Sequence, residues 1–437
     1  MPNDLPTKSA NRGQHYGAAP GVGVIDFLSL PEGTRETVIP IRSADGVASR
    51  GALYMRGGEK TVVCFSHPRG DMSRHYAAPA LLSAGFAAYG HQCRGLNNDV
   101  DCEHEKVLFD LAAAFRHLLD NYGFERMVLL GNSGGGSLLS FYQEQSSLSP
   151  PKRLTDTSAG EACDLNALDM PKADGVILIG VHPGEGAFMM NCIDPSVIDE
   201  ADPLSIDPSL DMYNPANGYR SPPEPSHYSR EFMARYREAQ RARVARLDAR
   251  AREWIGEQAR FRGLMRDSNF ERLALEERSY IARRANVGRY MIIYRTEANP
   301  AFCDLSLHSW SSTRKVGSII GPNPEILNYG PGGFARYLTP RAWLSSWSGL
   351  STRASIAGCL RAVREPLLIV SYTSDGGCFP DDNKEQLDAC ASSDKTMCCV
   401  PADHYGLPLT EREKALKLIA DWLKARFPAS RARAQVS

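Results

Sequence analysis

The 437-residue chain lacks three features that mark large classes of protein. It has no excess of charge of one sign, since 50 Lys and Arg face 51 Asp and Glu, so no basic field favours nucleic acid. No run approaches the roughly 20 apolar residues that cross a bilayer, and the N-terminus lacks the apolar core of a secretory signal. We therefore expect a cytoplasmic protein that binds neither nucleic acid nor membrane.

Paired cysteines are also missing. The eleven cysteines stand singly apart from Cys398 and Cys399, and no CxxC pattern occurs. Neither a disulfide framework nor a zinc site is indicated by this spacing. We expect reduced thiols and no bound metal.

Strand and helix patterns alternate along much of the chain, whose 43 % hydrophobic content is ordinary for a globular protein. Between residues 36 and about 186, short β-branched runs alternate with helical periodicity, which is typical of βαβ units and a parallel sheet. The strand pattern then stops until about residue 336, and an Arg-rich helix of roughly 30 residues begins at Ser229, by the spacing of its apolar residues. The strand pattern resumes at 366–371.

These patterns predict an α/β fold with a mostly parallel central sheet flanked by helices and interrupted by a large, mainly helical insertion. The predicted parts are a disordered leader (1–30), the first part of the core (31–185), a helical cap (186–336), the second part of the core (337–428) and a flexible tail (429–437).

The segment MVLLGNSGGG at 127–136 carries the strongest chemical signal. An apolar strand runs directly into the pattern Gly131-x-Ser133-x-Gly135, and a helix-competent segment follows. Small residues two positions before and after the serine allow a tight strand-to-helix turn that exposes its hydroxyl. A phosphate-binding glycine loop is the alternative, but the Gly-Lys-Ser/Thr ending of that loop is absent.

With this motif the sequence resembles the α/β-hydrolase superfamily, in which an acid and a histidine follow the nucleophile, each in a loop after a late strand. The segment SYTSDGGCFP is similar to the family's acid loop and places Asp375 there, whereas PADHYG is similar to the terminal histidine loop and places His404 there. Asp381 and Asp382 follow closely, so the register of the acid stays open.

The resemblance implies a division of roles. Ser133 would attack a carbonyl, His404 would accept and return its proton, and Asp375 would orient the imidazole. The backbone N–H of Gly134 would be one oxyanion donor.

The second oxyanion donor is expected from the loop Ser-His-Pro-Arg-Gly at 66–70, where proline replaces a family glycine. Because Pro68 has no N–H, Arg69 is the predicted donor and Gly70 the alternative. His67 is expected to pack in the loop or to line the pocket.

Further pocket candidates are Asn132 beside the nucleophile, His182 after the sixth predicted strand, and Trp343, which is expected in the core or the pocket wall. Apolar lining of this kind suits a bulky, partly aromatic substrate.

Residues 220–295 contain eighteen Arg, no Lys and ten Asp and Glu. These arginines can grip an anionic group of the substrate, or they can pair within the chain, for instance with the acidic stretch 193–211. The apolar stripe of the long helix can pack inside the cap or dock a second copy, giving a homodimer through the cap.

We expect a serine hydrolase that cleaves a carboxylic ester or lactone of a small molecule and needs no cofactor. Amide hydrolysis, acyl transfer and hydrolytic C–C cleavage use the same triad and remain open. A ligand-binding or scaffold protein with an idle triad is the alternative of a different class.

Overall fold

The computed structural model describes residues 26–96, 98–330 and 332–429, and it is built around one eight-stranded sheet. The strand order is β1-β2-β4-β3-β5-β6-β11-β12. β1 and β2 are antiparallel to each other and β2 is antiparallel to β4, whereas all other neighbours are parallel. The predicted fold class is therefore confirmed. The strands are β1 (Arg35–Arg42), β2 (Ala48–Met55), β3 (Thr61–Phe65), β4 (Ala87–Gln92), β5 (Arg126–Asn132), β6 (Gly175–Ile179), β11 (Leu367–Tyr372) and β12 (Lys395–Val400).

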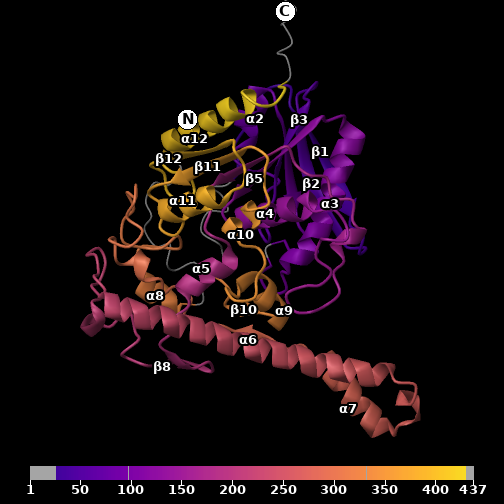
Figure 1. The fold of residues 1–437 in the computed structure, drawn as a ribbon, viewed down its shortest axis with the longest axis vertical. Coiled ribbons are helices and arrows are strands. Elements are labelled where there is room, and N and C mark those ends of the chain that lie inside the picture. Colours follow the sequence, from indigo (N-terminus) through magenta and orange to yellow (C-terminus); the bar gives the residue numbers. More distant parts are fainter. Residues whose placement is uncertain (1–25, 97, 331, 430–437) are drawn as a thin grey trace, which may run out of the picture.

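Helices cover both faces of this sheet (Figure 1). Val63 and Phe65 of β3 pack with the helices of one face, and Val62 and Cys64 pack with those of the other, because successive side chains of a strand point to opposite sides. Every residue of β3, β6 and β11 is buried, as expected for strands covered on both faces. One face carries α2 (Ala78–Ala84) and α12 (Leu409–Lys424), and the other carries α3 (His104–Tyr122), α4 (Gly134–Ser147), α10 (Ile356–Leu360) and α11 (Pro380–Ala389).

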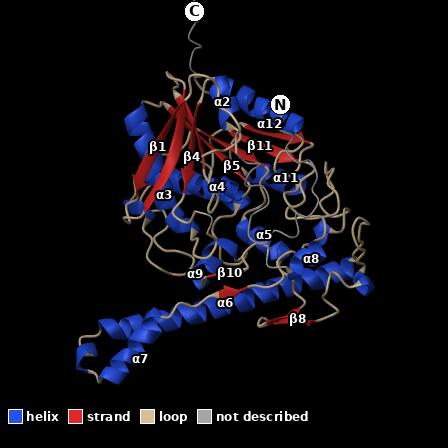
Figure 2. Ribbon diagram, turned by 180° about the vertical axis from the view of Figure 1, so that it is seen from behind, coloured by secondary structure: helices blue, strands red, loops and turns tan. Residues whose placement is uncertain are grey.

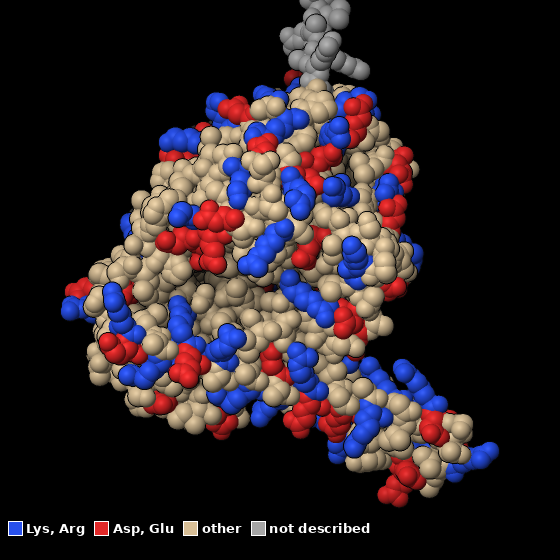
Figure 3. All heavy atoms as spheres, in the orientation of Figure 1, with Lys and Arg blue, Asp and Glu red and all other residues tan. Residues whose placement is uncertain are grey.

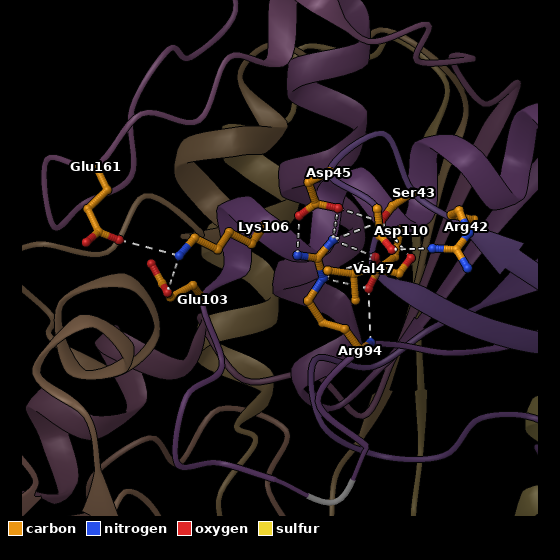
Figure 4. A network of polar contacts seen from close by, with 10 residues as sticks. Arg42, Ser43, Asp45, Val47, Arg94, Glu103, Lys106, Asp110 and Glu161 are labelled. Atoms are coloured by element: carbon orange, nitrogen blue, oxygen red, sulfur yellow. Dashed lines mark hydrogen bonds and ion pairs between the residues drawn. The ribbon is translucent and has the colours of Figure 1, made fainter. Parts of the chain in front are cut away.

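An ionic network connects the loop after β4 with α3 and with the turn between β1 and β2 (Figure 4). The Arg94 guanidinium lies 2.7 Å from a carboxylate oxygen of Asp110 in α3 and 2.6 Å from one of Asp45 in the turn between β1 and β2. The loop that follows β4 is thereby held against both elements.

The chain leaves the sheet after β6 and returns at β11, which lies beside β6 and parallel to it. The intervening segment forms a layer at one end of the sheet (Figures 1 and 2). It contains α5 (Glu185–Cys192), α6 (Arg230–Arg266), α7 (Leu275–Asn286), α8 (Pro324–Tyr329) and α9 (Pro340–Ala342).

Two small antiparallel pairs lie in or beside this mainly helical segment, where the sequence shows no strand pattern. They are β7 (Val197–Asp199) with β8 (Asp202–Ile206), and β9 (Met291–Ile292) with β10 (Tyr337–Leu338). Strands of two to five residues are too short to produce a readable period. β8 also contains Pro203, which usually argues against a strand.

The long predicted helix is present as α6, which spans 37 residues rather than about 30. Ser229 caps it by accepting a hydrogen bond from the Phe232 amide. The first two thirds of α6 pack on the rest of the layer through an apolar stripe that includes Tyr236, Val244 and Leu247. Its far end packs on α7 and projects with it as a helical arm (Figure 2).

The two ends of the chain lie largely outside the described residues, which begin at Asp26 and end at Ala429. Phe27 is nevertheless buried, edge-on to Tyr54 at 5.4 Å between ring centroids and beneath the guanidinium of Arg74. Phe27, which the sequence placed in the leader, thus packs against β2. The rest of the predicted leader up to residue 25, and residues 430–437 of the predicted tail, lie outside the described residues.

Acidic and basic side chains are interspersed over the face shown in Figure 3, including the projecting arm. Among the described helices, none is both long enough and apolar enough to cross a membrane.

Candidate functional site

Ser133 sits between β5 and α4 in a backbone conformation that few non-glycine residues adopt, with φ 53° and ψ −127°. The neighbouring glycines make this turn feasible. A Cβ on Gly131 would stand 2.6 Å from the Cα of Gly136, and one on Gly135 would overlap the carbonyl oxygen of Ser66. The motif is thus required by close backbone approaches on both sides of the serine.

Three predicted residues from distant parts of the chain meet at this turn. The Ser133 Oγ lies 3.1 Å from Nε2 of His404, and Nδ1 of His404 lies 2.7 Å from Oδ2 of Asp375. Asp375 is 1 % exposed, and His404 is partly buried. β5, β11 and β12 deliver the three loops to the same edge of the sheet, because parallel strands end together there.

The geometry distinguishes the three candidate acids. The second oxygen of Asp375 accepts hydrogen bonds from the amides of Gly377 and Cys378 at 2.8 and 3.0 Å, which orients the carboxylate. Asp381 instead accepts from the Trp310 amide, and Asp382 faces His308.

The charge of Asp375 acts on the imidazole beside it. Burial alone would lower the pKa of His404, but the charge of Asp375 and its hydrogen bond outweigh burial and raise the pKa above its usual value. The ring can therefore accept a proton from Ser133 and hold it.

Asp375, Cys378 and His404 also form a cluster whose ligand atoms lie within 4.8 Å of one another. The pKa of the Cys378 thiol is raised well above its usual value by burial and by the neighbouring carboxylates, so the thiolate that metals prefer is disfavoured. Nδ1 of His404 is already engaged by Asp375. These residues suit proton transfer better than metal binding.

The predicted oxyanion donors differ in what they face. Gly134 is the first residue of α4, so its N–H has no partner within the helix. The amides of Arg69 and Gly70 both donate to Nδ1 of His67, at 3.2 and 2.9 Å. Both backbone groups that the sequence offered as a second donor are thus occupied by the same ring.

The side chain of Arg69 takes part in a buried ionic network that sequence reasoning missed. It lies 2.5 Å from Asp99 and 3.2 Å from Glu185, and it stacks 4.7 Å from the Trp347 ring centroid. Glu185 also accepts a hydrogen bond from Ser137 and lies beside Gly134. The only hint in the sequence was an acidic residue a few positions after β6.

Glu185 is fully buried, yet its carboxylate is held in the charged form. Burial acts against the charge, but His104, His182, Arg69 and the bond from Ser137 outweigh it and lower the pKa of Glu185 to about 2. A carboxylate that is buried without such partners would be neutral.

The candidate pocket residues have different surroundings. Asn132 is buried and donates to the carbonyl of Ile179 at 2.9 Å. Nδ1 of His182 accepts from the Gly184 amide, and burial lowers the pKa of this ring to about 4. Trp343 is fully buried among residues of α6 and donates from Nε1 to Asp248, so it lies in a packed cluster rather than in an open wall.

Two arginines from the Arg-rich segment have internal partners. Arg243 is fully buried, and its guanidinium contacts Glu200 at 2.6 Å. Arg295 contacts Asp194 at 2.7 Å. Both acids belong to the stretch 193–211, so these two cations are neutralised within the chain.

The chain is similar to known proteins in structure rather than in sequence. No protein-family model matches the sequence, and no curated protein matches it. Its structure is similar to a hypothetical protein from Pseudomonas aeruginosa (13 % identity, TM-score 0.47, covering 92 % of this chain and 97 % of that one). It is also similar to an α/β hydrolase from Penicillium sp. sh18 (12 % identity, TM-score 0.46, covering 90 % of this chain and 99 % of that one). A third similar structure is the esterase domain of a Rhodothermus marinus protein (11 % identity, TM-score 0.43, covering 90 % of this chain and 98 % of that one). The strand order and the strand–serine–helix turn of this chain are those of the α/β-hydrolase fold.

Proposed function

We propose that this protein is a serine hydrolase that cleaves a carboxylic ester or lactone of a bulky small molecule through an acyl-enzyme on Ser133. The observation that carries the proposal is the continuous chain of contacts from Ser133 Oγ through His404 to Asp375, with distances of 3.1 and 2.7 Å. The strained backbone of Ser133 supports it, because such strain is usually retained at functional sites.

The first half-reaction forms the acyl-enzyme. As Ser133 Oγ attacks the ester carbon, its proton passes to Nε2 of His404, and the carbonyl oxygen becomes an oxyanion beside the Gly134 amide. The tetrahedral intermediate collapses when the C–O bond of the leaving group breaks. His404 returns its proton to that oxygen, and an alcohol departs.

The second half-reaction releases the acid. Water attacks the acyl carbon, and His404 takes one of its protons. The bond to Ser133 Oγ then breaks, and Oγ recovers the proton from His404. Asp375 stays ionised throughout and stabilises the imidazolium. The side chains of Ser133, His404 and Asp375, the backbone amide of Gly134 and one water molecule supply every group that these steps use.

The intact contacts also bear on the alternatives. A scaffold protein has no need to keep Ser133 strained and bonded to a histidine and a buried acid, so the enzyme is favoured over a protein with an idle triad. Amide hydrolysis, acyl transfer and C–C cleavage begin with the same attack and are distinguished by substrate.

A fluorophosphonate probe tests the proposal directly. We expect covalent labelling of the wild-type protein and none of Ser133→Ala. Ser147→Ala is the matched control, because this serine lies at the far end of the same helix and should leave labelling intact. Absence of labelling in folded wild-type protein would refute the proposal. A panel of short-chain aryl esters, lactones and aryl amides then ranks the substrate classes.

Self-association through the cap remains a further proposal. The helical arm exposes apolar side chains, among them Leu275 and Tyr280, which are 73 % and 52 % exposed. Such groups favour burial against a second copy. Sedimentation velocity over a range of concentrations tests this, and a monomer throughout would exclude the dimer.

A further inference from the structure

We infer that the side chain of His67, rather than the backbone of Arg69, supplies the second hydrogen bond to the oxyanion. This rests on the proposed function, because it assigns a donor for the same reaction. Three observations carry it: the bonding of Nδ1, the position of Nε2, and the charge balance next to Gly134.

The bonding of His67 determines where its proton is. Backbone N–H groups only donate, so Nδ1 must be an acceptor toward both Arg69 and Gly70. A neutral imidazole with an acceptor at Nδ1 carries its hydrogen on Nε2. Burial and the nearby Arg69 lower the pKa of His67 well below its usual value, which keeps the ring neutral near pH 7.

The Nε2 atom lies beside the residue that follows the nucleophile. A Cβ on Gly134 would stand 2.9 Å from it, so the ring edge and the first turn of α4 are in close approach. Among the described residues, Nε2 of His67 has no hydrogen-bond partner, and the residue is only partly buried. A donor hydrogen therefore lies close to Gly134, whose amide is the first proposed oxyanion donor.

The charge balance explains why the side chain of Arg69 does not take this role. Glu185 places a carboxylate on the same side of Gly134, and an unpaired anion there would oppose the formation of an oxyanion. The guanidinium of Arg69 pairs with Glu185 and Asp99, so its charge is already balanced. A neutral donor at His67 adds a hydrogen bond and leaves this network unchanged.

The same arrangement explains the proline in the loop. Pro68 fixes the backbone between His67 and Arg69, and it cannot compete for Nδ1 because it has no N–H. The two amides that follow it hold the imidazole instead of facing the substrate. The backbone amides of the loop thus hold His67 so that its Nε2–H can act as the donor.

Replacement of His67 by Asn and by Gln separates the two nitrogens. In His67→Asn the side-chain oxygen can replace Nδ1 as acceptor, but the donor at Nε2 is lost. We expect kcat for a p-nitrophenyl ester to fall by roughly 10²–10³, which is the usual effect of removing one oxyanion donor, whereas KM changes little. His67→Gln places an amide N–H nearer to Nε2 and should retain more activity. His227→Asn, at a side chain that is 84 % exposed, is the control and should match the wild type.

The readout that separates a donor from a packing residue is the affinity for an alkyl trifluoromethyl ketone, whose adduct with Ser133 bears an oxyanion. Its inhibition constant should rise in His67→Asn, His67→Gln and His67→Ala, in proportion to the fall in kcat/KM of each variant. His67→Ala frees both amides. If it or His67→Asn keeps kcat within about fivefold, the amides of Arg69 and Gly70 are the donors and our inference is wrong. Wild-type protein that hydrolyses no ester and takes no probe would instead overturn the proposed function.

Discussion

Replacing Asp375 by Asn tests the triad, because the structure dictates how the new side chain must lie. One oxygen of Asp375 accepts two backbone amides, from Gly377 and Cys378, and the other faces Nδ1 of His404. The oxygen of the amide must take the position that faces the two N–H donors. Its NH₂ group then points at His404 and turns Nδ1 into an acceptor.

This inversion moves the proton of His404 to Nε2, where it faces Ser133 Oγ 3.1 Å away. The imidazole can no longer accept the serine proton, although no atom has moved far. We expect kcat to fall by about 10⁴, or roughly 5.5 kcal/mol of transition-state stabilisation. Asp381→Asn, in the first turn of α11, where the carboxylate accepts a hydrogen bond from the Trp310 amide, is the matched control and should stay near wild type.

The pH dependence gives a second, independent readout. In the wild type Asp375 raises the pKa of His404, so kcat/KM should fall as the pH drops through a value above 6.5. Without that charge, Asp403 still raises the pKa of His404 but burial, the largest influence, lowers it, so the acid limb of the residual activity should move to lower pH. Hydrolysis of an aryl ester measured from pH 5 to 9 gives both quantities. Activity above about a tenth of wild type in Asp375→Asn, or a limb that does not move, would refute the reasoning.

Three further predictions concern the elbow, the cap and a buried acid. In Gly135→Ala the new Cβ would stand more than 1 Å inside ordinary contact with the Ser66 carbonyl, so we expect ester hydrolysis to fall about 10²-fold; Gly358→Ala, with no atom nearer than 3.5 Å, should be unaffected. Arg243→Met leaves Glu200 without its partner and should lower the free energy of unfolding by about 3–5 kcal/mol in urea titrations. The control Arg241→Met, on the exposed face of α6, should lower it by less than ~0.5 kcal/mol. Equal urea midpoints for the two variants would contradict this. Burial raises the pKa of Glu297 to about 7, so the folded state binds an extra proton and stability is lost as the pH rises from about 4.5 to 7. Glu297→Gln should remove up to ~3 kcal/mol of the loss in unfolding free energy between pH 5 and pH 8. The same loss in the variant as in the wild type would exclude the effect.

Local patterns predicted the core well because they are set by short-range chemistry. The apolar strand, the two glycines around Ser133 and the helix after it each follow from spacing within ten residues. The positions of Asp375 and His404 followed from family resemblance and chain order. Their register was open only over Asp381 and Asp382, and the two amides that orient Asp375 distinguish them.

The differences from the sequence predictions arise from contacts that leave no readable pattern in the sequence. The sequence offered the Arg69 amide as a donor, but the ring of His67 turns back to bind it. Phe27 was assigned to a disordered leader, but it finds Tyr54 in β2. The pairs β7–β8 and β9–β10 are too short to leave a pattern, and the second of them joins segments about 45 residues apart.

From its residues alone, this chain determines a strand–serine–helix turn and a mostly parallel sheet, because glycine spacing and alternating burial act within short windows. The order in which acid and histidine follow the nucleophile came from the family resemblance. Only the tertiary structure decides which nitrogen of His67 is a donor, why Glu185 stays charged beside Gly134, and where the cap arginines find partners. Those outcomes depend on side chains that are 100 residues or more apart in some cases and meet in a dry interior, where each charge and each hydrogen bond must find a partner.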